Sequence, residues 1–171
     1  FLLLDYPGYN RCEGKPSPAT SLQAHTLALS ALQETVTNRY GSGSQNYRLG
    51  LFGHSLGCAA LLQLAAEPTI AQQNRIDKVV LSSPFLSVPH MAQVLFPFIP
   101  ASYAKKVVRH DWDNTENIKG VHKSVIVRVL HAVGDTICPH AHGKELAALA
   151  KRRGLDAQFQ SMLKGGHNDM L

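Results

Sequence analysis

Serine, aspartate and histidine, which work together in one form of nucleophilic catalysis, each follow an apolar run in this sequence, at Ser55, Asp135 and His167. A serine hydroxyl attacks a carbonyl carbon readily only when a histidine accepts its proton. A carboxylate can hold that histidine in the correct tautomer and stabilise the imidazolium that forms. The first question is therefore whether Ser55 is a nucleophile or a small residue at a tight turn.

Ser55 lies in the pentapeptide GHSLG. The pattern GxSxG is typical of a sharp turn from a strand into a helix, where a strained serine projects its hydroxyl beyond the sheet. Such a turn leaves no room for side chains at the flanking positions, which favours Gly53 and Gly57. The segments YRLGLF before it and LGCAALLQLAAE after it predict that strand and helix. Because the first N–H groups of a helix are unpaired, the N–H of Leu56 is predicted to face an oxyanion.

The base must come from nine histidines. His167 lies in the loop KGGHND after the last apolar run, where two glycines let the backbone bring the imidazole back over a sheet. His131 lies within an apolar run and His122 precedes it, so both are expected to be packing or surface residues. His54 is expected to pack beside the turn. We therefore predict His167 as the base.

Asp135 is the predicted acid. It follows the run SVIVRVLHA in the loop VGDTICP, where a carboxylate could hold the imidazole. The alternative is an aspartate that caps a turn or a helix. Asp169 is close to His167 in sequence but would need a different geometry, and Asp111 and Asp113 lie in an irregular segment.

The elements that must position these residues alternate between apolar runs and helix-length amphipathic stretches, a pattern that indicates a parallel α/β sheet. We expect strands at residues 1–6, 47–54, 76–84, 124–132 and 157–163. We expect helices from residue 20 or 21 to about 38, from 56 to 67 and from 140 to 153. The length of 171 residues predicts one domain over residues 1–171, with no repeat or linker.

The alternation breaks between residues 84 and 122, a stretch rich in proline and aromatic residues. This insert is either a lid over a cleft or an irregular cap that completes the core. Phe96 and Phe98 within it are predicted to line a pocket for an apolar acyl chain.

Composition excludes several classes. The balance of 44% hydrophobic and 17% charged residues is that of a globular protein, and no run is long enough to span a bilayer. Three widely spaced cysteines predict reduced thiols, and the histidines lack metal-binding spacing, so we expect a cytoplasmic protein without a metal site. Two basic clusters predict either solvated helix faces or contact with an anionic membrane surface, and nucleic acid is not expected as a partner. They are Lys105, Lys106 and Arg109, and Lys151, Arg152 and Arg153.

Four motifs in order, LDYPGYNRCEGKPSP, GHSLG, HAVGDTICP and GGHND, resemble the α/β-hydrolase superfamily, and most closely its abhydrolase-domain esterases and acyl-protein thioesterases. The resemblance covers nearly the whole chain. It implies a mostly parallel sheet flanked by helices and no cofactor or metal. It also implies hydrolysis of an ester or thioester through an acyl-enzyme on Ser55, with His167 as base and Asp135 as its orienter.

The sequence departs from that family at its beginning. Family members have further strands before the one that FLLLDY resembles, and a loop with an HG-type motif supplies the second oxyanion donor. We therefore expect an N-terminally incomplete piece of a hydrolase, a rearranged sheet in which FLLLDY lies beside YRLGLF, or a chain completed by a second one. Two other functions stay open, a catalytically impaired binding protein and a peptidase or amidase. The sequence predicts no oligomeric state.

Overall fold

The structure, a computed structural model, describes residues 1–41, 47–73, 76–98, 103, 108 and 110–169. The chain divides into two compact units, residues 1–48 and residues 49–171. The single domain over residues 1–171 stays a prediction. The basic cluster of Lys105, Lys106 and Arg109 lies outside the described residues.

The first unit contains one long helix, α1 (Pro18–Tyr40). It begins at Pro18, two residues before the earliest predicted start, because Ser17 and Thr20 form a capping box. The N–H of Thr20 donates to Oγ of Ser17 at 3.1 Å, and the N–H of Ser17 donates to Oγ1 of Thr20 at 3.0 Å. Pro18 in the first turn loses no intrahelical hydrogen bond, since its missing N–H would be unpaired there.

The strand predicted at residues 1–6 is wrong. These residues form no regular structure, and Phe1 and Leu3 are exposed. An apolar run becomes a strand only when a neighbouring strand accepts its backbone hydrogen bonds. In the described part of residues 1–48 no strand offers that edge, and the rearranged sheet with FLLLDY beside YRLGLF is not formed.

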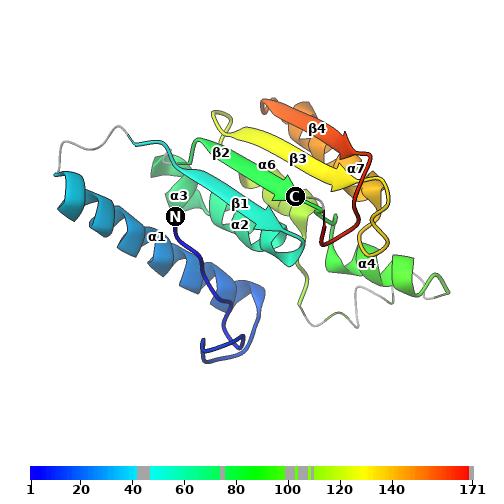
Figure 1. Cartoon of the computed structure of the whole chain (residues 1–171), viewed down its shortest axis with the longest axis horizontal. Helices are drawn as coiled ribbons and strands as arrows, with labels where there is room; N and C mark the ends of the chain where they lie inside the picture. The colour runs from blue at the N-terminus through cyan, green and yellow to red at the C-terminus, as the bar shows by residue number, and fades with distance from the viewer. Residues whose placement is uncertain (42–46, 74–75, 99–102, 104–107, 109, 170–171) are drawn as a thin grey trace. The chain divides into compact units, whose positions relative to one another are not determined.

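The second unit is built on a parallel sheet in the order β1-β2-β3-β4 (Figure 1). The strands are β1 (Gly50–His54), β2 (Lys78–Ser82), β3 (Ile126–Ala132) and β4 (Ala157–Met162). All four lie within predicted runs. Their carboxyl ends meet at one edge of the sheet, because the strands are parallel.

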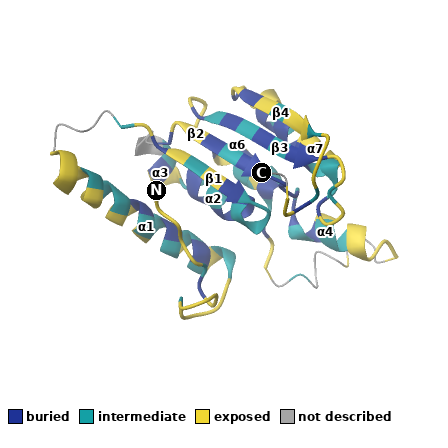
Figure 2. Ribbon diagram, viewed as in Figure 1, coloured by how far each residue is buried: buried dark blue, intermediate teal, exposed yellow. Residues whose placement is uncertain are grey.

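Three helices, α2 (Leu56–Ala66), α6 (Asn114–Gly120) and α7 (His140–Arg152), form one layer against a face of this sheet (Figure 1). The short helix α3 (Pro68–Gln73) follows α2. The core lies between the sheet and this layer, where β2, β3 and α2 are largely buried (Figure 2). None of the helices in the described residues is long and apolar enough to cross a membrane.

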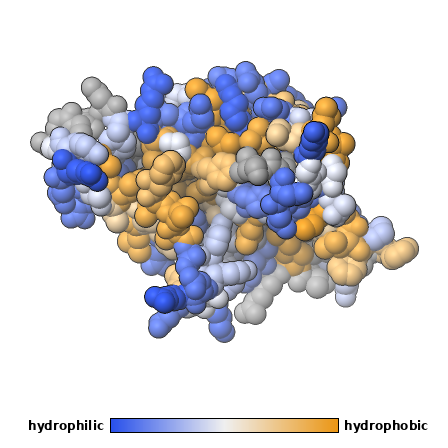
Figure 3. All heavy atoms as spheres, in the orientation of Figure 1, coloured by the Kyte–Doolittle hydropathy of each residue, from blue (hydrophilic) through white to orange (hydrophobic). Residues whose placement is uncertain are grey.

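The segment predicted as a lid or cap insert, residues 84–122, begins and ends in the core. Phe85 and Trp112 are buried, and Nδ2 of Asn114 donates to the carbonyl of Phe85 at 2.8 Å. Between these anchors, α4 (Val88–Leu95) ends in an apolar surface region (Figure 3). Its exposed residues are Val94, Leu95, Phe96 and Phe98.

Candidate active site

Ser55 occupies the turn between β1 and α2 with φ of 51° and ψ of −117°, a region that L-residues rarely adopt. The turn depends on glycine at position 53. A Cβ on Gly53 would lie 2.6 Å from the carbonyl carbon and oxygen of Gly57 and 2.8 Å from the backbone nitrogen of Cys58. The sequence therefore folds here into the strained turn that its glycines predict.

The backbone of Ser55 is held by the neighbouring strand. Its N–H donates to the carbonyl of Ser82 at 2.9 Å, and the Cys58 thiol, in the first turn of α2, donates to the carbonyls of Gly53 and Ser82 at 3.2 Å. Leu56 begins α2, so its N–H has no intrahelical partner. The Ser55 side chain lies near the Cys138 thiol and lowers its pKa.

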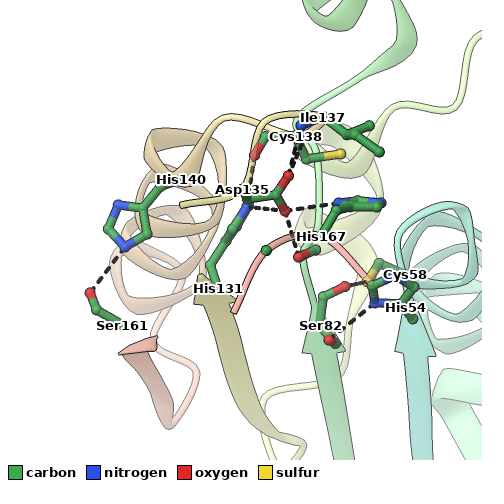
Figure 4. Close-up of polar contacts among 12 residues, drawn as sticks. His54, Cys58, Ser82, His131, Asp135, Ile137, Cys138, His140, Ser161 and His167 are labelled. Carbon is green, nitrogen blue, oxygen red and sulfur yellow. Dashed lines mark hydrogen bonds and ion pairs between the residues drawn. The ribbon is translucent and has the colours of Figure 1, made fainter. Parts of the chain in front are cut away.

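Asp135 lies in the loop after β3, and each of its carboxylate oxygens has a distinct set of donors (Figure 4). Oδ1 accepts the backbone N–H groups of Ile137 at 2.9 Å and Cys138 at 2.8 Å. Oδ2 accepts the hydroxyl of Ser83 at 2.7 Å and bonds Nδ1 of His167 at 2.8 Å. The segment after β4 thus returns along the carboxyl edge of the sheet and brings His167 to the carboxylate.

A second histidine contacts the same carboxylate oxygen. Nε2 of His131 lies 3.2 Å from Oδ2 of Asp135 and 3.0 Å from the carbonyl of Cys138. The prediction that His131 packs in the interior agrees with its complete burial, but sequence reasoning missed its contact with the acid. Because both neighbours are acceptors, the proton of a neutral His131 lies on Nε2.

The environment of Asp135 favours its ionised form. Burial alone would raise the pKa of the carboxyl. The hydrogen bonds from Ser83, His167 and the backbone N–H groups of Cys138 and Ile137 outweigh burial and lower the pKa to about 2. Asp135 is therefore a carboxylate throughout the neutral pH range.

His167 is the other partner in this contact, and its side chain is 8% exposed. Its ring lies against that of His54, with centroids 4.9 Å apart, and Nδ1 of His54 lies 3.2 Å from the hydroxyl of Ser82. Among the described residues no hydrogen bond joins the Ser55 hydroxyl to His167. The structure thus joins two of the three predicted residues directly and holds the third at the same edge of the sheet.

The cysteines near the site are poor nucleophiles. Burial raises the pKa of the Cys58 thiol far above its ordinary value. Burial and the negative charge of Asp135 raise the pKa of the Cys138 thiol to about 11, against the opposing effect of the nearby Ser55 side chain. Since a thiolate is the reactive form, Ser55 is the better candidate nucleophile. In the described residues no group of three His, Cys, Asp or Glu side chains is placed to bind a metal ion.

The predicted acyl pocket is not enclosed. Phe96 and Phe98 are 56% and 93% exposed. A cavity of about 580 Å³ lies elsewhere, between α4, α6 and α7. Its lining consists of Leu86, His90, Thr115, Lys119, Ala141, His142, Glu145 and Leu149 and includes none of the predicted catalytic residues.

Sequence reasoning missed Ser83 as well as His131. Ser83 is buried immediately after β2, with φ of 49°. The available signal was position: Ser83 and His131 both lie near the carboxyl ends of strands that flank the site. Which of several polar residues at that edge reaches the carboxylate depends on loop conformation, which the pattern of apolar residues does not specify.

Known proteins resemble this chain over most of its length. No protein-family profile matches it. It is 29% identical over 168 residues to uncharacterized protein Rv2307c of Mycobacterium tuberculosis, and 29% identical over 177 residues to alpha/beta hydrolase domain-containing protein WAV2 of Arabidopsis thaliana. These alignments cover 98% of this chain but 53% and 54% of the two relatives. The chain therefore spans about half the length of the curated relatives it matches.

Solved structures share its fold. Acylaminoacyl peptidase from Pyrococcus horikoshii matches with a TM-score of 0.63 and 14% identity over 89% of this chain and 25% of that one. Esterase Pf2001 from Pyrococcus furiosus matches with a TM-score of 0.62 and 16% identity over 95% of this chain and 60% of that one. Identities this low show the fold alone. The chain has an α/β-hydrolase fold, which confirms the predicted fold class and supports the resemblance to that superfamily.

Proposed function

We propose that this chain carries the catalytic residues of a serine hydrolase that cleaves a carboxylic ester or thioester through an acyl-enzyme on Ser55. The observation that carries the proposal is the combination, at one edge of one sheet, of the strained Ser55 turn and the 2.8 Å contact between Asp135 and His167. Strained backbone is concentrated at functional sites, because only a constraining surrounding structure maintains it.

In the proposed reaction His167 works through Nε2, because Asp135 occupies Nδ1. Nε2 accepts the hydroxyl proton as Oγ of Ser55 attacks the carbonyl carbon, and the N–H of Leu56 stabilises the oxyanion. Collapse of the tetrahedral intermediate expels an alcohol or thiol, which takes the proton from Nε2. Water, activated by the same nitrogen, then attacks the acyl-enzyme, releases a carboxylic acid and restores Ser55.

One rearrangement precedes this reaction. Among the described residues the Ser55 hydroxyl makes no hydrogen bond with His167, so it has to approach Nε2 before its proton can move. Hydrogen bonds between a nucleophile and its base often shorten only when substrate is bound. In the structure the nucleophile is therefore not yet hydrogen-bonded to its base.

Two further candidates each have an observation in their favour. Among the described residues no hydrogen bond joins Ser55 to His167, which favours a binding protein that retains the catalytic residues without turnover. The fold shared with an acylaminoacyl peptidase favours a peptidase or amidase. Hydrolysis rates of an ester and an anilide of the same acyl group distinguish an esterase from an amidase, because the two substrates differ only in their leaving group.

The test is covalent labelling of the purified chain with a fluorophosphonate, followed by intact mass and peptide mapping. We expect one adduct on Ser55, none in Ser55→Ala, and labelling slowed about 1000-fold or more in Asp135→Asn, in which the imidazole is held in the wrong tautomer. A folded wild-type chain that forms no adduct would contradict the proposal and favour the binding protein.

The acyl pocket is tested separately with a series of p-nitrophenyl esters of increasing chain length. If Phe96 and Phe98 contact the acyl chain, Phe96→Ala and Phe98→Ala change the ratio of kcat/KM between long and short esters. An unchanged ratio would place the acyl chain elsewhere.

A further inference from the structure

We propose that Ser83 and His131 are positioning residues, which fix the carboxylate of Asp135 so that it holds His167 in the orientation needed for proton transfer. This inference rests on the proposed function. Neither residue is expected to touch substrate, because both are completely buried behind the acid.

The two carboxylate oxygens of Asp135 have different partners, and this difference supports the positioning role. Oδ1 is held by the backbone N–H groups of Ile137 and Cys138, which belong to the same loop as Asp135. Oδ2 is the oxygen that bonds His167, and its other contacts come from Ser83 after β2 and from His131 in β3. Contacts from two neighbouring strands therefore tie the functional oxygen to the sheet, whereas the loop alone would leave it free to turn.

Ser83 is itself held firmly. Its N–H donates to the carbonyl of Leu130 at 2.9 Å, which fixes it against β3, and its φ of 49° turns the chain sharply at the end of β2. Ser55 and Ser83 thus directly follow adjacent strands, and both have a positive φ. The hydroxyl of Ser83 is directed at the carboxylate of Asp135.

His131 acts as a neutral donor. Burial lowers the pKa of its imidazole, against the effects of the Cys138 carbonyl and Asp135. Its Nδ1 is buried and has no hydrogen-bond partner among the described residues, so a second ring proton would find no acceptor. The titratable groups that face Asp135 are therefore a neutral His131, His167 and the protonated thiol of Cys138.

The experiment combines two measurements on Ser83→Ala and on a pair of His131 variants. The first is the rate of Ser55 phosphonylation, and the second is the pKa of Asp135 from its carboxyl ¹³C shift as a function of pH. His131→Gln keeps an N–H donor near the position of Nε2, and His131→Leu removes it. Ser87→Ala is the matched control, because it removes a buried hydroxyl that caps α4 and does not touch Asp135.

We expect Ser83→Ala to slow phosphonylation about tenfold, equivalent to about 1.4 kcal/mol, and to raise the pKa of Asp135 from about 2 toward its ordinary 3.8. His131→Leu should slow labelling less than Ser83→Ala, because His131 lies 3.2 Å from the carboxylate oxygen and Ser83 lies 2.7 Å from it. His131→Gln should retain most of the labelling rate. Ser87→Ala should change neither quantity.

Two outcomes distinguish this inference from the proposed function. If Ser83→Ala folds and changes neither the labelling rate nor the Asp135 titration, the positioning role is overturned. If the wild type is not labelled but Ser83→Ala still shifts the Asp135 titration, the hydrolase proposal fails. The interaction of Ser83 with the Asp135 carboxylate would then be established independently of the hydrolase proposal.

Discussion

Gly143 in α7 lies directly against the imidazole of His131: a Cβ at position 143 would fall 2.5 Å from Nδ1 and 3.2 Å from Cγ of that ring. His131 is completely buried, so its ring cannot move into solvent to make room. The absence of a side chain in the second turn of α7 therefore allows His131 to reach Asp135.

Gly143→Ala tests this packing. Alanine in a helix interior ordinarily stabilises by about 1 kcal/mol relative to glycine. Here we expect a loss of about 1 to 3 kcal/mol in the free energy of unfolding, because the added methyl group meets a buried ring. Urea unfolding at neutral pH measures the change.

A double-mutant cycle supplies the control for that prediction. In a His131→Ala background the ring is absent, so Gly143→Ala should become neutral or stabilising, with a coupling energy of at least about 1 kcal/mol. Equal effects of Gly143→Ala in the two backgrounds would show that the methyl group clashes with something other than His131.

The sequence was informative where a local pattern determines the structure. The strands β2 and β3 lie within the predicted runs because side chains that alternate along them are buried in the core, and Gly53 identifies the turn because no side chain fits there. The meeting of Asp135 and His167 follows from the same topology, since both lie in loops that follow adjacent parallel strands.

The remaining features depend on contacts that no local pattern specifies. FLLLDY has the composition of a strand, but its structure depends on an available sheet edge. Ser83 and His131 resemble many other polar residues near strand ends until the loop after β3 brings Asp135 to them. The predicted role of Phe96 and Phe98 stays a prediction: both side chains are exposed, and their contact with an acyl chain does not follow from composition.

The serine turn provides a second stability prediction, with a matched control on the same strand. Gly53→Ala would place its methyl group 2.6 Å from backbone atoms of Gly57, which cannot move without breaking the start of α2. We expect a loss of more than about 3 kcal/mol or a failure to fold. Gly50→Ala has nothing within 4 Å and should stay within about 1 kcal/mol of wild type.

Urea unfolding of both variants measures this difference. A Gly53→Ala chain as stable as Gly50→Ala would mean that the turn relaxes easily. The steric account of the GxSxG pattern would then not hold for this protein.

His142 is expected to make stability depend on pH in the mildly acidic range. Burial, with the neighbouring His90 and His131, lowers the pKa of His142 from its ordinary 6.5 to about 4. Between these values the unfolded chain binds the proton and the folded chain does not, so stability is lost as pH falls from about 6.5 to 4. The loss from this residue is at most about 3 kcal/mol.

His142→Gln should remove that part of the dependence, which unfolding midpoints at pH 4.5 and 7 would show. The dependence should not vanish, because the pKa of His131 is also lowered and acts in the same direction. His122→Gln, at an exposed position, is the control. An equal change in pH dependence for both variants would contradict a specific role for the half-buried His142 ring.

Asp135 is expected to make stability depend on pH in a more acidic range than His142 does. Its pKa in the folded chain, about 2, is below the ordinary 3.8, so its ionised form stabilises the fold. That contribution, about 2 kcal/mol, is complete above about pH 4 and is lost as pH falls toward 2. Asp135→Asn should therefore be less stable than wild type at pH 6, and the difference should shrink as pH falls through this window.

Urea midpoints between pH 2 and 6 measure this difference in stability. Glu13→Gln, at an exposed position, controls for the loss of one charge. A difference that stays constant with pH would mean that Asp135 stabilises the loop through its shape and not through its charge.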